Sequence, residues 1–324
     1  MPELMIEATG LVKRYGDLTA VGGVDISVPR GTVLSILGPN GAGKTTTVRM
    51  LTTLSSIDEG SATVAGQDVI ADPETVRALI GLTAQNATVD GLLTGRENLV
   101  MIGELHHLGR KRAIERAEEL LRQFSLTDAA DRRVDTYSGG MRRRIDLAAT
   151  LVSTPPVLFL DEPTTGLDPR ARRELWDVLD DLVDSGATIL LTTQYLEEAE
   201  RLADDIVVID HGKVIARGTP NELKRILGGD QIQLIVRDPQ RLDEATQILA
   251  GVAAEGSTPQ ADRETGATVV QTDGGVEALS RTAAALHSAG IEVDDLGIRQ
   301  PTLDEVFLHL TGHDATDNTE EASA

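Results

Sequence analysis

Short apolar runs and amphipathic stretches alternate along the first two thirds of the chain. Mostly apolar residues over 32–37, 157–160 and 187–192 predict strands that are buried on both faces. Between the last two runs, apolar residues recur at helical spacing and predict a helix with one buried face, formed by Leu175, Val178, Leu179 and Leu182. Buried strands that alternate with such helices are typical of α/β proteins with a largely parallel sheet.

Other segments of the first two thirds follow different patterns. Near the N-terminus, the extended segments 4–8 and 19–28 are separated by turns and predict additional strands. Residues 86–151 are mostly helical in pattern, and we expect them to form an inserted helical subdomain. Its predicted buried face contains Ile114, Ala117, Leu121 and Phe124. Residues 205–210 and 213–216 predict a hairpin.

The pattern changes after Gly228-Gly229. From there to residue 312, strand and helix patterns alternate in the order β-α-β-β-α-β, which predicts a small ferredoxin-like layer. Residues 313–324 are polar and acidic, and we expect them to be disordered. The sequence therefore predicts a domain over 1–227, an α+β domain over 228–312 that serves packing or dimerisation rather than sensing, and a tail.

Composition and charge narrow the classes of function. The chain has 324 residues and a net charge of −22, and the stretch from Pro220 onward contributes 19 acidic and 7 basic residues, a balance of −12. Such an acidic chain is a poor candidate for general nucleic-acid binding. It has no cysteine, which excludes disulfides and cysteine–metal centres. No apolar run approaches the roughly 18 residues of a membrane span, so we expect a cytosolic chain that reaches the membrane only through a partner.

A glycine-rich loop lies between the strand at 32–37 and a predicted helix over 46–54. Its sequence is Gly38-Pro39-Asn40-Gly41-Ala42-Gly43-Lys44-Thr45, the G-x-x-x-x-G-K-[ST] motif in the strand–loop–helix context that it requires. Backbone N–H groups of such a loop and the helix N-terminus surround phosphate oxygens, and the lysine adds a full positive charge. The threonine hydroxyl suits Mg²⁺. We expect the chain to bind a nucleoside triphosphate.

Two carboxylates follow the buried strand at 157–160. Asp161 and Glu162 come directly after it, at the end of a parallel strand where ligands bind in open α/β sheets. Phosphoryl transfer to water requires a metal, positive charge and a group that orients water. Lys44, Asp161 and Glu162 supply most of these requirements.

The order of the motifs resembles that of ABC transporter ATP-binding subunits over about residues 4–227. The most specific match is Tyr137-Ser138-Gly139-Gly140-Met141, which keeps the Ser-Gly-Gly centre of the family's signature loop but differs at both flanks. The resemblance implies an α/β P-loop NTPase fold of ABC type, with a mixed core sheet, an antiparallel β subdomain and a helical subdomain. It also implies ATP and Mg²⁺ as cofactors.

The resemblance assigns roles to matching residues. Tyr15 resembles the aromatic residue that stacks on adenine, and Gln85 resembles the glutamine that contacts the metal and links the site to the helical subdomain. The loop from Gly38 to Thr45, together with Thr46, would hold the phosphates and Mg²⁺. Asp161 resembles the Walker B aspartate that supports Mg²⁺.

The resemblance also implies catalytic roles and partners. Glu162 resembles the general base, and Asp168 resembles the residue that communicates across a dimer. In the family, the signature loop serves a site on another copy, so Ser138, Gly139 and Gly140 imply a head-to-tail dimer with two shared ATP sites. Gln194 stands where most members have a histidine that contacts the γ-phosphate. Because an amide donates a hydrogen bond but carries no charge, we expect turnover to be slower while ATP binding is retained.

The flanking residues resemble one subfamily, the daunorubicin/doxorubicin-resistance ATPase subunits. The matching stretches are Tyr-Ser-Gly-Gly-Met-Arg-Arg-Arg, Thr-Thr-Gln-Tyr-Leu-Glu-Glu-Ala-Glu and the segment 301–308. This resemblance implies a motor at the cytoplasmic face of the membrane that drives a separate polytopic permease to export an amphipathic drug or lipid-like metabolite. The alternative is a soluble ABC-type ATPase that acts on nucleic acid or ribosomes, which lacks support from a tandem domain or a basic surface. A predicted helix begins with Arg142, Arg143 and Arg144. Their side chains either face solvent or contact the nucleotide or a partner chain.

Overall fold

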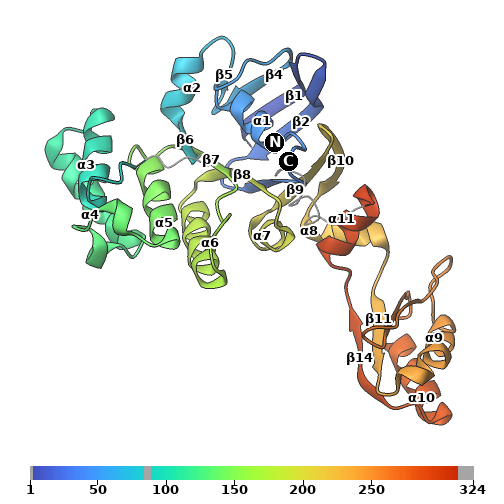
Figure 1. Ribbon diagram of the computed structural model, residues 1–324. Helices are drawn as coiled ribbons and strands as arrows, with labels where there is room; N and C mark the ends of the chain where they lie inside the picture. Colours follow the sequence, from blue (N-terminus) through green and yellow to red (C-terminus); the bar gives the residue numbers. More distant parts are fainter. Residues whose placement is uncertain (1–2, 84–88, 313–324) are drawn as a thin grey trace. The chain divides into compact units, whose positions relative to one another are not determined.

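The computed structural model describes residues 3–83 and 89–312. The chain forms two compact units, the first ending at Pro220 and the second beginning at Asn221 (Figure 1). This border precedes the division after residue 227 that the pattern predicted. Within the described residues, no helix is long and apolar enough to cross a membrane.

A six-stranded sheet forms the centre of the first unit. Its strands, in spatial order, are β10 (Lys213–Gly218), β9 (Asp205–Asp210), β3 (Val33–Leu37), β8 (Thr188–Thr193), β7 (Val157–Asp161) and β6 (Ile80–Thr83). All neighbours are parallel except β10, which pairs with β9 as the expected antiparallel hairpin. Every residue of β3, β7 and β8 is buried, so the three predicted buried strands are confirmed. Their carboxyl ends carry the phosphate loop, the carboxylate pair and Gln194.

An antiparallel sheet and a helix cover one face of this central sheet. The sheet contains β2 (Leu18–Pro29), β1 (Leu4–Tyr15), β4 (Glu59–Val64) and β5 (Gln67–Asp68), in that order. Helix α1 (Lys44–Leu51) contributes Val48 to the core on this face, where Phe159 of β7 is also buried. Both β1 and β2 extend beyond the expected segments, because register shifts between them interrupt the alternation of apolar and polar residues.

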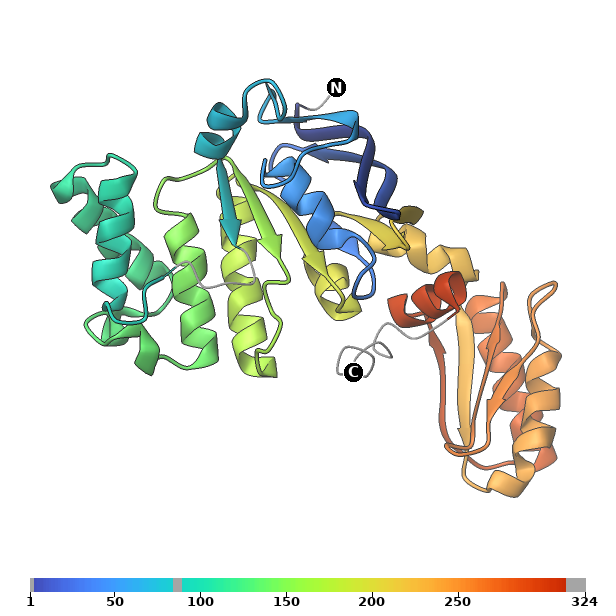
Figure 2. The ribbon, with the colours of Figure 1, turned by 45° about the horizontal axis from the view of Figure 1, so that its top comes forward.

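Helices cover the opposite face, where Leu158 and Leu160 of β7 are buried. Helices α5 (Gly139–Thr150) and α6 (Pro169–Asp184) lie side by side there (Figure 2). The predicted buried face of α6 is confirmed. The other helices of the first unit are α2 (Pro73–Leu79), α3 (Gly95–Leu105), α4 (Arg110–Gln123), η1 (Thr127–Ala129), η2 (Val134–Thr136) and α7 (Leu196–Leu202).

Helix α4 corrects one sequence prediction. Ala117, Leu121 and Phe124 are buried as expected, but Ile114 is 41% exposed. Ala113 is buried instead, and it lies so close to Gly103 of α3 that a Cβ on that glycine would be 2.7 Å from the alanine Cβ. The two helices approach through small residues, so the buried stripe of α4 is turned away from Ile114.

The second unit is the predicted α+β layer. Strands β12 (Gln260–Asp262), β13 (Ala267–Gln271), β11 (Gln231–Val236) and β14 (Val293–Arg299) form an antiparallel sheet in that order. Its own core includes Leu234 of β11, Leu249 of α9 and Leu286 of α10. The remaining elements are α8 (Pro220–Lys224), η3 (Arg225–Leu227), η4 (Pro239–Arg241), α9 (Leu242–Ala250), α10 (Gly275–Ala289) and α11 (Leu303–Thr311). The β-α-β-β-α-β order is confirmed.

Candidate nucleotide-binding site

The glycine-rich loop connects β3 to α1 in a conformation that requires glycine at two positions. Gly43 precedes the helix with φ of 105°, in the left-handed region, and a Cβ there would meet the Ala20 carbonyl oxygen at 2.5 Å. A Cβ on Gly38 would meet the Ile209 carbonyl oxygen at 2.2 Å. These glycines let the backbone fold tightly, with the N-terminus of α1 next to the loop.

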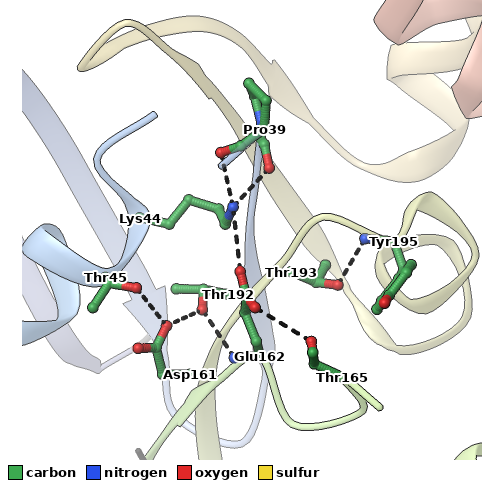
Figure 3. Close-up of polar contacts among 10 residues, drawn as sticks. Pro39, Lys44, Thr45, Asp161, Glu162, Thr165, Thr192, Thr193 and Tyr195 are labelled. Atoms are coloured by element: carbon green, nitrogen blue, oxygen red, sulfur yellow. Dashed lines mark hydrogen bonds and ion pairs between the residues drawn. The ribbon is translucent and has the colours of Figure 1, made fainter. Parts of the chain in front are cut away.

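Lys44 lies inside this loop. Its Nζ donates hydrogen bonds to the carbonyl oxygens of Gly38 and Pro39, at 2.8 and 2.9 Å, and lies 3.5 Å from Glu162 Oε1 (Figure 3). Burial lowers the pKa of Lys44, and the neighbouring Glu162 carboxylate opposes that shift. The ammonium is thus held between the phosphate loop and the carboxylate pair, where a terminal phosphate would need positive charge.

A small polar cavity opens beside Lys44. It measures about 200 Å³ and is lined by Ala20, Asn40, Gly41, Gly43, Lys44, Thr45, Thr46 and Glu162. That volume suits phosphate groups rather than a whole nucleotide. The structure therefore brings together residues of the predicted loop, Thr46 and Glu162.

Asp161 ends β7 beside two threonines. The hydroxyls of Thr45 and Thr192 both donate to Asp161 Oδ1, at 3.1 and 2.6 Å (Figure 3). Oxygen atoms of this kind are what Mg²⁺ prefers, and Mg²⁺ at phosphate sites takes only one or two carboxylates beside phosphate and water. Thr45 and Asp161 therefore fit Mg²⁺, although among the described residues no group of three or more acidic or histidine side chains is arranged to hold a metal ion by itself.

Glu162 has an unusual backbone. Its φ of 49° lies in the left-handed region, which costs a residue other than glycine about 1–2 kcal/mol. Its N–H donates to the carbonyl and hydroxyl oxygens of Thr192, both at 3.1 Å. The Thr165 hydroxyl donates to Glu162 Oε2 at 3.3 Å. Neighbouring groups thus hold both the main chain and the carboxylate of Glu162.

The other predicted site residues lie at element ends around this centre. Tyr15 ends β1 and is 49% exposed, and Lys13 Nζ lies 5.5 Å from the centroid of its ring. Asp168 begins α6, accepting hydrogen bonds from the N–H groups of Arg170 and Ala171. Gln194 directly follows β8 and is half-buried. Gln85 lies outside the described residues.

The Ser-Gly-Gly loop lies at the start of α5. Ser138 is the residue before the helix, and its Oγ accepts from the Met141 N–H at 3.3 Å. Among the described residues, the cavity at Lys44 is not lined by Ser138, Gly139 or Gly140. The structure does not bring this loop into the same chain's phosphate cavity.

Sequence reasoning missed two residues near the site and left the role of a third open. Thr192 had a usable signal, because it lies next to the end of a buried strand that neighbours the strand of Asp161, and the two residues pair in register. Glu198 had none: it is fully buried in α7, accepts from Trp176 Nε1 at 3.3 Å, and burial raises its pKa.

Arg143 is that third residue: of its two predicted roles, a solvated helix start is wrong, and a contact with nucleotide or a partner chain stays a prediction. It donates to main-chain oxygens of the carboxylate turn at the end of β7. Arg144 donates to the Phe124 carbonyl at 3.2 Å, and Arg142 donates to the carbonyls of Val134 and Asp135. Each guanidinium therefore contacts its own chain.

A glycine-rich phosphate loop with a buried lysine, beside carboxylates at the end of another parallel strand of the same sheet, defines a P-loop nucleoside triphosphatase. The family described as ABC transporter matches residues 21–165. Daunorubicin resistance ATP-binding protein DrrA2 of Streptomyces coeruleorubidus is 53% identical, over 98% of each chain. Daunorubicin/doxorubicin resistance ATP-binding protein DrrA of Streptomyces peucetius is 52% identical, over 100% of this chain and 97% of that protein.

A solved structure agrees with these relatives. The ADP conformation of an ATP-binding cassette of an ABC transporter is 27% identical, with a TM-score of 0.62 over 68% of this chain and 92% of that one. The chain belongs to the ABC transporter family, as one of its ATP-binding subunits. It is an ATPase, and the predicted ABC-type fold and family resemblance are confirmed.

Proposed function

We propose that this chain is the motor of an exporter, which couples ATP hydrolysis to efflux of an amphipathic drug or lipid-like metabolite through a separate membrane permease. The observation that carries the motor assignment is the placement of Glu162 against Lys44, at the wall of the phosphate cavity. The export of drugs is supported by the relatives named for daunorubicin resistance, which align with the chain over nearly its full length.

In this proposal, the phosphate loop and Lys44 hold the β- and γ-phosphates of ATP. Mg²⁺, when bound, neutralises charge on the phosphates, and Thr45 and Asp161 would hold it, with Gln85 as a further predicted contact. Glu162 accepts a hydrogen bond from the attacking water and takes its proton as the water oxygen bonds to the γ-phosphorus. The bond between that phosphorus and the β–γ bridging oxygen breaks in the same displacement, and ADP is the leaving group. Tyr15 offers an exposed ring on which adenine can stack.

The site needs a second copy of the chain. The Ser138 hydroxyl and the N–H groups after it suit a γ-phosphate, yet they do not line the cavity at Lys44. A head-to-tail dimer would place this loop of one copy over the phosphate loop of the other, with Asp168 at the junction. ATP would then join the copies, and hydrolysis would release them.

The transport cycle requires a partner that spans the membrane. We place the chain at the cytoplasmic face, attached through a polytopic permease that contacts the helical subdomain. The test is efflux from cells that express the chain together with a candidate polytopic permease from a neighbouring gene, measured against a panel of amphipathic compounds. Efflux that depends on both proteins supports the proposal, and equal efflux with and without the chain contradicts it.

The contact with the permease gives a first prediction. Leu92 is 70% exposed, ahead of α3, and its change to Asp is expected to reduce drug efflux at least about tenfold by placing a charge in an apolar interface. Binding of ATP by the purified chain should stay within twofold of the parent. The matched control is Val276→Asp in the second unit, where an apolar side chain is 74% exposed. Unchanged efflux in the Leu92 variant would remove the contact from this segment.

Gln194 gives a second prediction. Replacing it with His adds a group that can carry charge toward the γ-phosphate, and charge-assisted hydrogen bonds are about twice as strong as neutral ones. We expect Gln194→His to raise kcat by up to about tenfold with little change in the KM for ATP. Steady-state phosphate release at saturating Mg²⁺ and ATP measures the effect. Gln194→Leu, which removes the donor, should be slower than the parent, and a His variant no faster than the parent would refute the role.

A further inference from the structure

The turn after β7 is contacted by a side chain from the helix that follows the Ser-Gly-Gly loop. Arg143, in the second turn of α5, donates from Nε to the Pro163 carbonyl at 2.6 Å and from one terminal nitrogen to the carbonyls of Asp161 and Glu162, both at 3.1 Å. Three successive carbonyl oxygens therefore converge on one planar guanidinium. Arginine suits this arrangement because its donors are held in a fixed fork.

These bonds lie at the residue whose backbone is strained. Glu162 adopts φ of 49°, and such a conformation persists only when surrounding groups hold it. Thr192 accepts from the Glu162 N–H, while Arg143 donates to the carbonyls on both sides of that residue. The peptide units before and after Glu162 are therefore both fixed, and with them the direction in which its carboxylate leaves the main chain.

The surroundings of Arg143 offset only part of the cost of burying its charge. Its guanidinium is half-buried, and burial lowers its pKa, but the carboxylates of Asp146, Glu198, Asp161 and Glu162 act in the opposite direction. A half-buried cation is costly unless it is paired and hydrogen-bonded. The carbonyl oxygens of Asp161, Glu162 and Pro163 supply hydrogen-bond acceptors for this cation at the turn after β7.

We propose that Arg143 is a positioning residue for ATP hydrolysis, which holds the Asp161–Pro163 turn so that the Glu162 carboxylate faces the phosphate cavity. Because Ser138 is the residue directly before the same helix, the position of Glu162 is tied through α5 to the loop that is expected to bind the partner copy's nucleotide. This inference rests on the proposed role of Glu162 as the base.

The test is steady-state ATP hydrolysis by the purified full-length chain with Mg²⁺. Arg143→Ala is expected to lower kcat at least about tenfold, with the KM for ATP and the midpoint of thermal unfolding close to those of the parent. Arg143→Lys keeps one donor group and should recover part of the lost kcat. If the Ala variant does not fold, the Lys variant is compared with the parent in its place. Arg116→Ala is the matched control, since Arg116 is also half-buried and donates to a main-chain carbonyl, that of Leu151, at 2.9 Å.

A double variant separates positioning from general stabilisation. In the Glu162→Gln background, Arg143→Ala should lower kcat by less than about twofold, because the group that it positions is already gone. Three outcomes would overturn the inference. The first is that Arg143→Ala lowers kcat by the same factor in the parent and in the Glu162→Gln background, and the second is that Arg116→Ala lowers kcat as much as Arg143→Ala does. The third is that Arg143→Ala hydrolyses ATP at the parent rate while Glu162→Gln is inactive. A parent rate for Glu162→Gln alone would instead overturn the assignment of the base, independently of the Arg143 results.

Discussion

Glu162→Gln is expected to lower kcat for ATP hydrolysis by about 10²–10⁴-fold, the range for loss of a general base. The amide has the shape of the carboxylate and can still accept from the Thr165 hydroxyl, but it cannot take a proton from water. The KM for ATP should stay the same or fall, since a negative charge beside the phosphate cavity is removed. Phosphate release at saturating ATP and equilibrium binding of a labelled nucleotide measure the two effects.

The control for this variant is Glu197→Gln. Glu197 belongs to α7 and its side chain is 72% exposed, so its charge is screened by water and its loss should leave kcat within twofold. Hydrolysis by Glu162→Gln at the parent rate would show that another group orients the water. Weakened ATP binding with an unchanged kcat would assign Glu162 to binding instead.

Mixing two inactive variants is expected to restore hydrolysis. Lys44→Ala removes the charge at the phosphate loop, and Ser138→Arg blocks the loop at the start of α5, so each protein alone should have almost no activity. In a head-to-tail dimer of one copy of each, the intact Lys44 of one chain meets the intact Ser138 of the other. An equal mixture should then recover roughly a quarter of the parent rate, since half of the dimers are mixed and each has one complete site.

The control protein carries both changes, Lys44→Ala and Ser138→Arg, in one chain, and it is mixed with either single variant. In neither mixture does an intact Lys44 meet an intact Ser138 of the other copy, so no activity should be recovered. If the Ser138 loop served the phosphate loop of its own chain, no mixture would recover activity. Absence of recovery, with dimers shown to exchange subunits, would therefore refute the head-to-tail arrangement.

The parts of the site that the sequence could predict depend on local patterns. The loop from Gly38 to Thr45 is a contiguous motif whose function is set by its own backbone, and the buried strand before Asp161 is continuous in apolar residues. The strands β3, β7 and β8 were equally visible, since a strand covered on both faces has few polar positions. The family resemblance then added roles to residues that such patterns leave without one, such as Asp168.

The parts that escaped prediction depend on packing between distant segments. Arg143 contacts carbonyls 18 to 20 residues further along the chain, a relation that exists only once α5 lies against the end of β7. Ile114 was predicted to lie on the buried face of α4, but it is exposed. The buried face is set by the close approach of α3 and α4 at Gly103, and the pattern of one helix alone does not reveal such a contact. In β1, register shifts interrupted the alternating pattern, so its length could not be inferred from the sequence.

The chain contains one tryptophan, Trp176, which is 5% exposed and donates to the buried Glu198. Glu198 lies in the first turn of α7, four residues beyond Gln194, which follows β8. Intrinsic tryptophan fluorescence of the whole protein therefore originates at a single position beside the catalytic end of the central sheet. A change in its emission on addition of nucleotide reports on that region alone, without a dye and without a background from the second unit.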